Sequence, residues 1–168
     1  QIRSRLNSVL TLFDAEGTVI AENNDYDFRP DALLAVRLPR DGRYVLRLHD
    51  FENQSGGDVS YRLNVGEFPL VTGVFPLGLQ AGTTAEFALT GFNLPTATLR
   101  FSAPPDAAGK IVTLPVASLR PARVAISEFA EVRSSSTYTV PVPAFVNGRV
   151  RTSEGERVRF RARRGEVV

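Results

Sequence analysis

The fold of this chain is decided by one strictly alternating stretch, Arg43-Tyr44-Val45-Leu46-Arg47-Leu48. Successive side chains of a β-strand point to opposite faces, so Tyr44, Leu46 and Leu48 share one face and the two arginines share the other. This pattern predicts a strand with one buried face and one face in water.

Residues 59–65 alternate in the same way and predict a second strand, whose apolar face can meet the first. Residues 8–13 also alternate, so this segment predicts a third strand whose apolar face can pack with those of the other two. The predicted core of this part of the chain is formed by Leu10, Leu12, Tyr44, Leu46, Leu48, Tyr61 and Leu63.

Alternation recurs along the whole chain between turn residues, and helical periodicity is nearly absent. Residues 14–17 and 39–42 each end in a glycine, which supplies the positive φ that tight turns need. The sequence therefore predicts an all-β fold of tandem β-sandwiches, with helix limited to short turns. Further strands are expected at residues 71–76, 85–90, 97–101, 111–114, 123–126 and 136–140.

Prolines divide this series of strands. Pro69 cannot donate to a sheet ladder, and Pro141 and Pro143 stiffen a short extended spacer. We therefore expect three segments: a partial sandwich at 1–66, a complete sandwich at 67–140, and a linker with further strands at 141–168.

Composition excludes several classes of protein. No apolar run approaches the roughly 18 residues of a membrane-spanning helix. The absence of cysteine excludes disulfides, thiolate metal sites and cysteine nucleophiles. All basic residues except Lys110 are arginine, and they alternate with core residues instead of forming a platform with aromatics, so we expect no nucleic-acid partner.

The chain also lacks methionine, and we expect it to be an internal piece of a longer polypeptide.

Two stretches of the first part resemble the bacterial pre-peptidase C-terminal domain: residues 8–17 (SVLTLFDAEG) with 20–25, and residues 42–50 (GRYVLRLHD). The resemblance covers residues 6–66 and implies a jelly-roll-like sandwich, an accessory without catalytic residues in secreted proteases and other large surface proteins. Residues 145–168 resemble the beginning of a second copy and supply strands that the first part lacks.

The middle part resembles a different family. Residues 73–78 (GVFPLG), Gly82 and residues 89–94 (LTGFNL) are similar to the immunoglobulin-like domain of the plexin and transcription-factor type. That resemblance implies a spacer or a protein-binding surface.

The residues give little support to catalysis. His49 lies beside Asp50, but neighbouring residues of a strand point to opposite faces, so Asp50 is badly placed to orient the ring of His49 as a general base. No Gly-x-Ser-x-Gly elbow occurs. We expect a protein that is not an enzyme.

An oxygen-rich loop is the candidate metal site. Asn24, Asp25 and Asp27 offer amide and carboxylate oxygens of the kind that calcium prefers. The same residue types are also usual in solvated turns. The sequence predicts no cofactor and leaves calcium at this loop as the alternative.

We interpret the sequence as a non-catalytic accessory module of a larger bacterial protein that is secreted, periplasmic or on the cell surface, serving as spacer and protein-interaction scaffold. The alternative is a module that binds extracellular polysaccharide or fibrous protein, with or without calcium. Expected partners are the rest of the parent polypeptide, an extracellular protein or polysaccharide, and a second copy through strand swapping. A polyanion is a further candidate ligand for the arginines near the carboxyl end: Arg149, Arg151, Arg157, Arg159, Arg161, Arg163 and Arg164.

Overall fold

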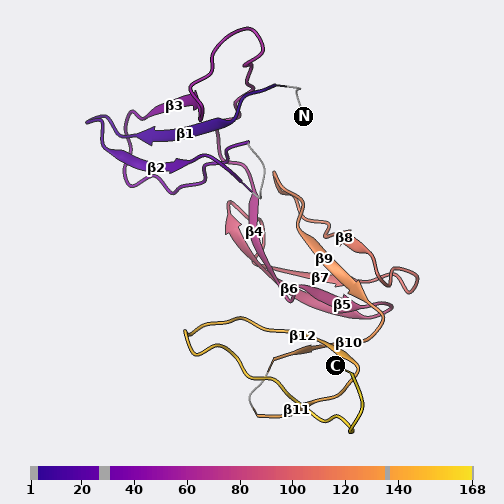
Figure 1. Cartoon of the computed structure of the whole chain (residues 1–168). Coiled ribbons are helices and arrows are strands. Elements are labelled where there is room, and N and C mark those ends of the chain that lie inside the picture. Colours follow the sequence, from indigo (N-terminus) through magenta and orange to yellow (C-terminus); the bar gives the residue numbers. More distant parts are fainter. Residues whose placement is uncertain (1–3, 27–30, 135–136, 168) are drawn as a thin grey trace. The chain divides into compact units, whose positions relative to one another are not determined.

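The computed structural model describes residues 4–26, 31–134 and 137–167 of the chain (Figure 1). The described residues form strands, turns and loops and contain no helix. This confirms the predicted all-β class. The chain divides into two compact units, 1–66 and 67–168, which are described separately below. None of the described segments is a helix long and apolar enough to cross a membrane.

The first unit contains a three-stranded antiparallel sheet of order β2-β1-β3. Its strands are β1 (Ser8–Phe13), β2 (Val19–Asn23) and β3 (Val45–Asp50). Leu10 pairs with Leu48 and Leu12 with Leu46, so these four leucines share one face, as the alternation predicts. We call this the leucine face. Residues 32–36 are half-buried, and the Ala32 amide donates to the Ser8 hydroxyl of the same face.

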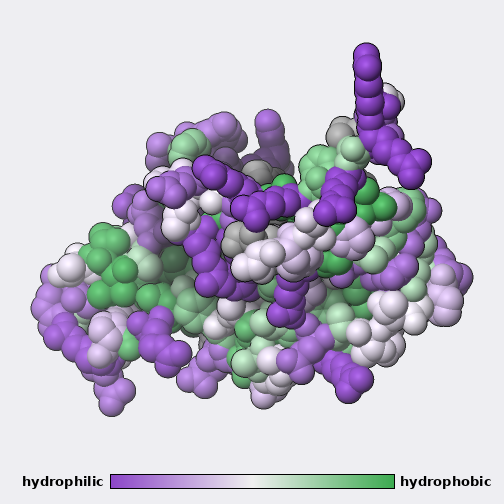
Figure 2. All heavy atoms as spheres, turned by 90° about the horizontal axis from the view of Figure 1, so that it is seen from below, coloured by the Kyte–Doolittle hydropathy of each residue, from purple (hydrophilic) through white to green (hydrophobic). Residues whose placement is uncertain are grey.

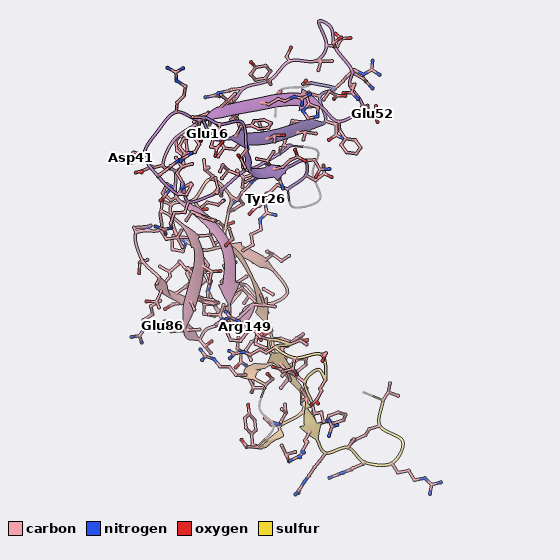
Figure 3. The ribbon with its side chains drawn as sticks, turned by 90° about the vertical axis from the view of Figure 1, so that its left-hand side faces the viewer. Glu16, Tyr26, Asp41, Glu52, Glu86 and Arg149 are labelled. Carbon is pink, nitrogen blue, oxygen red and sulfur yellow. The ribbon has the colours of Figure 1, made fainter. Side chains whose placement is uncertain are left out.

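Side-chain contacts fix the turns at the ends of this sheet. The Asp14 carboxylate accepts from the Glu16 amide at 3.1 Å and from the Thr18 amide at 2.8 Å. Gly17 has a φ of 84°, as the predicted turn requires. Arg40 forms ion pairs with Asp14 and Glu16 and so ties the second predicted turn to the first. Figure 3 shows Glu16 and Asp41 at one end of the sheet and Glu52 at the other.

The predicted strand at residues 59–65 is wrong. These residues have no strand structure, and Tyr61 is 63% exposed and Leu63 39% exposed. The backbone around the start of this stretch bonds to the amino-terminal segment instead: the Arg5 amide donates to the Asp58 carbonyl, and the Ser60 amide to the Ser4 hydroxyl. An alternating sequence buries a face only where it pairs with a sheet, and here that pairing is absent.

The second unit contains two three-stranded sheets. One has the order β4-β6-β7, with β4 (Leu70–Phe75), β6 (Thr84–Phe92) and β7 (Thr98–Ser102) all antiparallel. The other has the order β5-β9-β8, with β5 (Gly78–Gln80), β8 (Ile111–Thr113) and β9 (Arg123–Ser127). In it β5 runs parallel to β9, and β8 antiparallel.

Both sheets contribute side chains to one hydrophobic core. Phe87 of β6 has no exposed surface, and Leu114, which follows β8, is 1% exposed. Burial of such side chains supplies about 1.5–3 kcal/mol each, so this core is the main stabilising element of the second unit. Its buried members are Val71, Leu79, Phe87, Leu89, Ala103, Ala107, Leu114, Ala122, Val124 and Ile126.

Four short strands complete the second unit. Strand β10 (Ala130–Arg133) pairs in parallel with β12 (Ala144–Asn147), and β11 (Thr139–Val140) with β13 (Arg159–Phe160). The sequence analysis treats residues 141–168 as a separate segment. In the structure this segment pairs with strands that precede Pro141, and it belongs to the same compact unit as residues 67–140. Phe129 and Phe145 stack at a centroid distance of 6.2 Å beside this pairing.

The predicted strands of the second unit are found at five places with shifts of one or two residues. The predicted strand at 136–140 shortens to Thr139–Val140, and Ser136 lies outside the described residues. Strands β5 and β10 are not predicted. Each is very short, so it contains too few residues for alternation to be recognised.

Gly91 is required by the pairing of β4 with β6. A Cβ atom at this position would lie 1.9 Å from the carbonyl oxygen of Leu70, next to the register shift between Val71 and Gly73. We predict that Gly91→Ala lowers the free energy of unfolding by about 3 kcal/mol, because the obstacle is backbone and cannot rotate away. Chemical denaturation measures this. Gly57→Ala, whose Cβ would meet nothing within 4 Å, is the control. A loss below about 0.5 kcal/mol at Gly91 would contradict the predicted clash.

Candidate functional site

The face of the first sheet opposite the leucines carries polar and charged side chains. Residues directly opposite each other in an antiparallel pair share a face. Thr11 pairs with Arg47 of β3 and with Glu22 of β2, and Val9 pairs with His49. We call this surface the polar face. The register therefore places a cation and an anion on either side of the central threonine.

The polar face is hollowed. An open cavity of about 620 Å³ lies on it, and its lining includes Thr11, Glu22, Asn24, Arg47, His49 and Phe51. Sites for small molecules usually measure about 300–1,000 Å³ and combine apolar walls with a few polar groups. This cavity has both, because Val9 and Phe13 also line it.

Thr11 forms the centre of the floor. It is 3% exposed, and its hydroxyl donates to the Glu22 carboxylate at 2.7 Å. A hydrogen bond to an ionised carboxylate is shorter and stronger than one between neutral groups. The bond therefore holds Glu22 in position while leaving most of its acceptor capacity free.

His49 and Asp50 do not act together. The Asp50 carboxylate accepts from the amides of Asn7 at 2.8 Å, Glu52 at 2.9 Å and Gln54 at 3.0 Å. Asp50 pairs with Ser8 on the leucine face, whereas His49 belongs to the polar face. Among the described residues, the His49 Nδ1 atom is buried and has no hydrogen-bond partner. The geometry of a base oriented by a carboxylate is therefore not formed by this pair.

The three amide bonds lower the pKa of Asp50. The hydrogen bond from the Gln54 amide has the largest effect, followed by that from Asn7, while desolvation acts in the opposite direction. These bonds also shape the turn after β3, in which Asn53 has a φ of 59°. Asp50 thus links the end of β3 to the segment that precedes β1.

The predicted calcium residues are only partly described. Asn24 lines the cavity, and the Asp25 carbonyl accepts from the Asn23 side chain at 3.0 Å. Asp27 lies outside the described residues. In the described ranges no group of three or more histidine, cysteine, aspartate or glutamate side chains is placed to hold a metal ion. Calcium at Asn24, Asp25 and Asp27 stays a prediction.

A second polar cluster lies in the second unit. Asn147, the last residue of β12, is buried. Its Oδ1 accepts from the Leu77 amide at 2.8 Å, its Nδ2 donates to Glu131 of β10, and its carbonyl accepts from the Ser134 amide at 2.7 Å. Gly78 leaves room for Glu131, because a Cβ there would lie 2.8 Å from its Oε1. We call these contacts the Asn147 clamp.

The arginines near the carboxyl end are exposed. Within the described part of the chain no acidic side chain forms an ion pair with any of them. The Arg149 guanidinium lies 4.4 Å from the centre of the Phe75 ring, and Figure 3 shows where this residue lies. Figure 2 shows hydrophilic side chains extending from a surface on which hydrophobic patches are also exposed.

Sequence reasoning missed most of the polar face. It identified Asn24 and examined His49, but Thr11, Glu22 and Arg47 drew no attention as a group. The available signal was the alternation of each strand, which assigns faces. The register that joins the three residues depends on strand pairing.

Comparison of the chain with protein-family models, with curated proteins and with solved structures finds no match in any of the three. The function must therefore be argued from the residues.

The lowered pKa of Asp50 predicts acid sensitivity. A carboxyl whose pKa is lower in the folded state stabilises that state above its unfolded pKa of about 3.9, and this contribution is lost as the pH falls through the folded pKa. We expect the wild type to lose more thermal stability than Asp50→Asn between about pH 6 and about pH 3. Melting curves measure this, with the exposed Asp41→Asn as control. Equal losses in wild type and Asp50→Asn would show that the amide bonds do not couple to protonation.

Proposed function

We propose that this chain is a non-catalytic accessory module of a larger bacterial protein that is secreted, periplasmic or on the cell surface. Its role is that of a spacer and a scaffold for protein interactions. The Asn147 clamp is the observation that carries this proposal. A spacer must hold the segment that leaves it in place, and the clamp fixes β12 against β10 and against the residue before β5.

The clamp acts at the place where a flexible connection would otherwise be expected. Residues 141–143 are rich in proline and form no strand. Directly after them, β12 pairs with β10, and Asn147 bonds to the amide of Leu77, which precedes β5. The following segment is thereby attached to the sandwich through side-chain and backbone bonds and does not depend on the linker alone.

Hydrogen exchange tests the clamp. We predict that Asn147→Ala speeds exchange of the Leu77 and Ser134 amides about tenfold or more, because leaving buried partners unpaired costs about 1–3 kcal/mol. Exchange at Phe87 in the core should stay unchanged. The exposed Asn64→Ala is the matched control.

A further variant separates hydrogen bonding from side-chain volume. Asn147→Asp keeps the acceptor for Leu77 but places a second carboxylate against Glu131, so it should also speed exchange. Adding Glu131→Gln should restore protection, because the amide can donate to the new carboxylate. Unchanged exchange in Asn147→Ala would contradict a fixed connection, and with it the spacer role.

The cavity on the polar face favours a second function, that of a ligand-binding module for extracellular polysaccharide or fibrous protein. It unites charged groups on the strands with an amide and an exposed aromatic ring at the ends of β2 and β3. Sedimentation with insoluble polysaccharides and with collagen-like fibres separates this function from that of a spacer, which binds neither.

We infer that a second copy of the chain is a partner. Several large apolar side chains after Pro143 are exposed, among them Phe145, Val150, Val158 and Phe160. Strand β13 pairs only with β11, in a two-stranded sheet, so each of these strands keeps one unpaired edge. The unpaired backbone groups of such an edge can pair with another chain. Strand swapping with the first unit of another molecule would cover these side chains.

Self-association should therefore rise with concentration in analytical ultracentrifugation. Phe160→Asp should lower it, because a charge opposes burial of this surface. Val65→Asp, at an exposed position outside any strand, should leave it unchanged. A chain that stays monomeric at every concentration would contradict strand swapping.

A further inference from the structure

We propose that the cavity on the polar face binds a uronic acid unit of an acidic polysaccharide. This inference rests on the second of the proposed functions and specifies its ligand. It is carried by the juxtaposition of Arg47 and His49 on one side of Thr11 with Glu22 on the other.

The β3 side of the cavity is suited to a carboxylate. Arg47 and His49 are two positions apart on one strand and therefore share the polar face. No acidic side chain in the described ranges forms an ion pair with Arg47. A guanidinium offers paired donors that match the two oxygens of a carboxylate. The Nδ1 atom of His49 is enclosed by protein, so a ligand would contact the Nε2 edge of the ring.

The β2 side is suited to hydroxyl groups. Glu22 lies two strand spacings from Arg47, which is about 10 Å between backbones. Its carboxylate can only accept hydrogen bonds, and sugar hydroxyls are donors that satisfy it. Asn24 adds an amide that both donates and accepts. The Thr11 hydroxyl holds Glu22 in place before any ligand arrives.

An aromatic wall completes the cavity. Phe51 is 57% exposed, and Phe13 lines the same cavity from β1. Phe51 lies two positions beyond His49 and so follows Arg47 and His49 along the chain. The C–H faces of a pyranose ring pack well against such rings. An exposed phenyl ring beside polar groups loses contact with water when a sugar covers it.

Other ligand classes fit these groups less well. A neutral sugar would leave the Arg47 guanidinium without its counter-charge. A polyphosphate has no hydroxyl groups along its chain to donate to the Glu22 carboxylate, so it would leave this side of the cavity unsatisfied. An apolar peptide would bury charged side chains without partners, which is costly. A uronic acid carries one carboxylate and several hydroxyls, and so satisfies both sides of the cavity.

Calorimetry with the full chain tests the proposal, using a short oligogalacturonate as the probe. Dextran oligomers of similar length and inorganic polyphosphate serve as the comparison ligands. We expect the oligogalacturonate to bind, and Arg47→Gln to weaken its binding at least tenfold. Glu22→Gln should weaken it as well. The control Arg43→Gln removes an exposed arginine just before the same strand and should change affinity less than twofold.

Each other outcome overturns the proposal. If the oligogalacturonate does not bind, the proposal is excluded. It is also excluded if Arg47→Gln leaves the binding unchanged while Arg159→Gln abolishes it, because the carboxyl-terminal arginines would then hold the ligand. Equal binding of polyphosphate through Arg47 would indicate a general anion site. Melting curves of each variant exclude loss of folding. Dextran bound as tightly as the oligogalacturonate would contradict the uronic acid while leaving the ligand-binding function in place.

Discussion

The pairing of β1 between β2 and β3 is the constraint on which the first unit depends. A shift by one residue would exchange the two faces of β1 completely. In the observed register Leu10 and Leu12 meet Leu48 and Leu46, and Thr11 lies between Arg47 and Glu22. The same pairing therefore determines both the buried leucines and the composition of the cavity. Asp50 fixes the end of this arrangement by binding three backbone amides.

The second unit depends on an apolar core. Its two sheets enclose a core with Phe87 at the centre, and few polar groups enter it. Asn147 is one of its buried polar residues, and it bonds to Leu77 and to Glu131 where β12 joins the sandwich. Because buried polar groups must be paired, these contacts specify one arrangement of β12 against the sandwich. A well-packed sandwich with a fixed exit is what the spacer proposal requires.

The sequence predicted the strands that contain a long alternating stretch of apolar and polar residues. It did not predict which strands pair, or which residues that pairing brings together. Leu46 and Leu48 were assigned to the correct face, because a strand of six residues shows its period clearly. Residues 59–65 alternate equally well but join no sheet, since alternation does not encode a partner. Strand β5 has three residues and no readable period. Asn24 was singled out as a calcium ligand and lines the cavity, whereas Thr11 and Glu22 become neighbours only through the register.

The central claim is that the register of the first sheet brings Thr11, Arg47 and Glu22 together. Nuclear Overhauser effects between backbone protons of neighbouring strands measure this register directly in solution. The account predicts cross-strand contacts of Thr11 with both Arg47 and Glu22, and of Leu10 with Leu48. Contacts displaced by one residue, such as Thr11 with Leu46 or Leu48, would place the leucines and the charged residues on exchanged faces and would contradict the account.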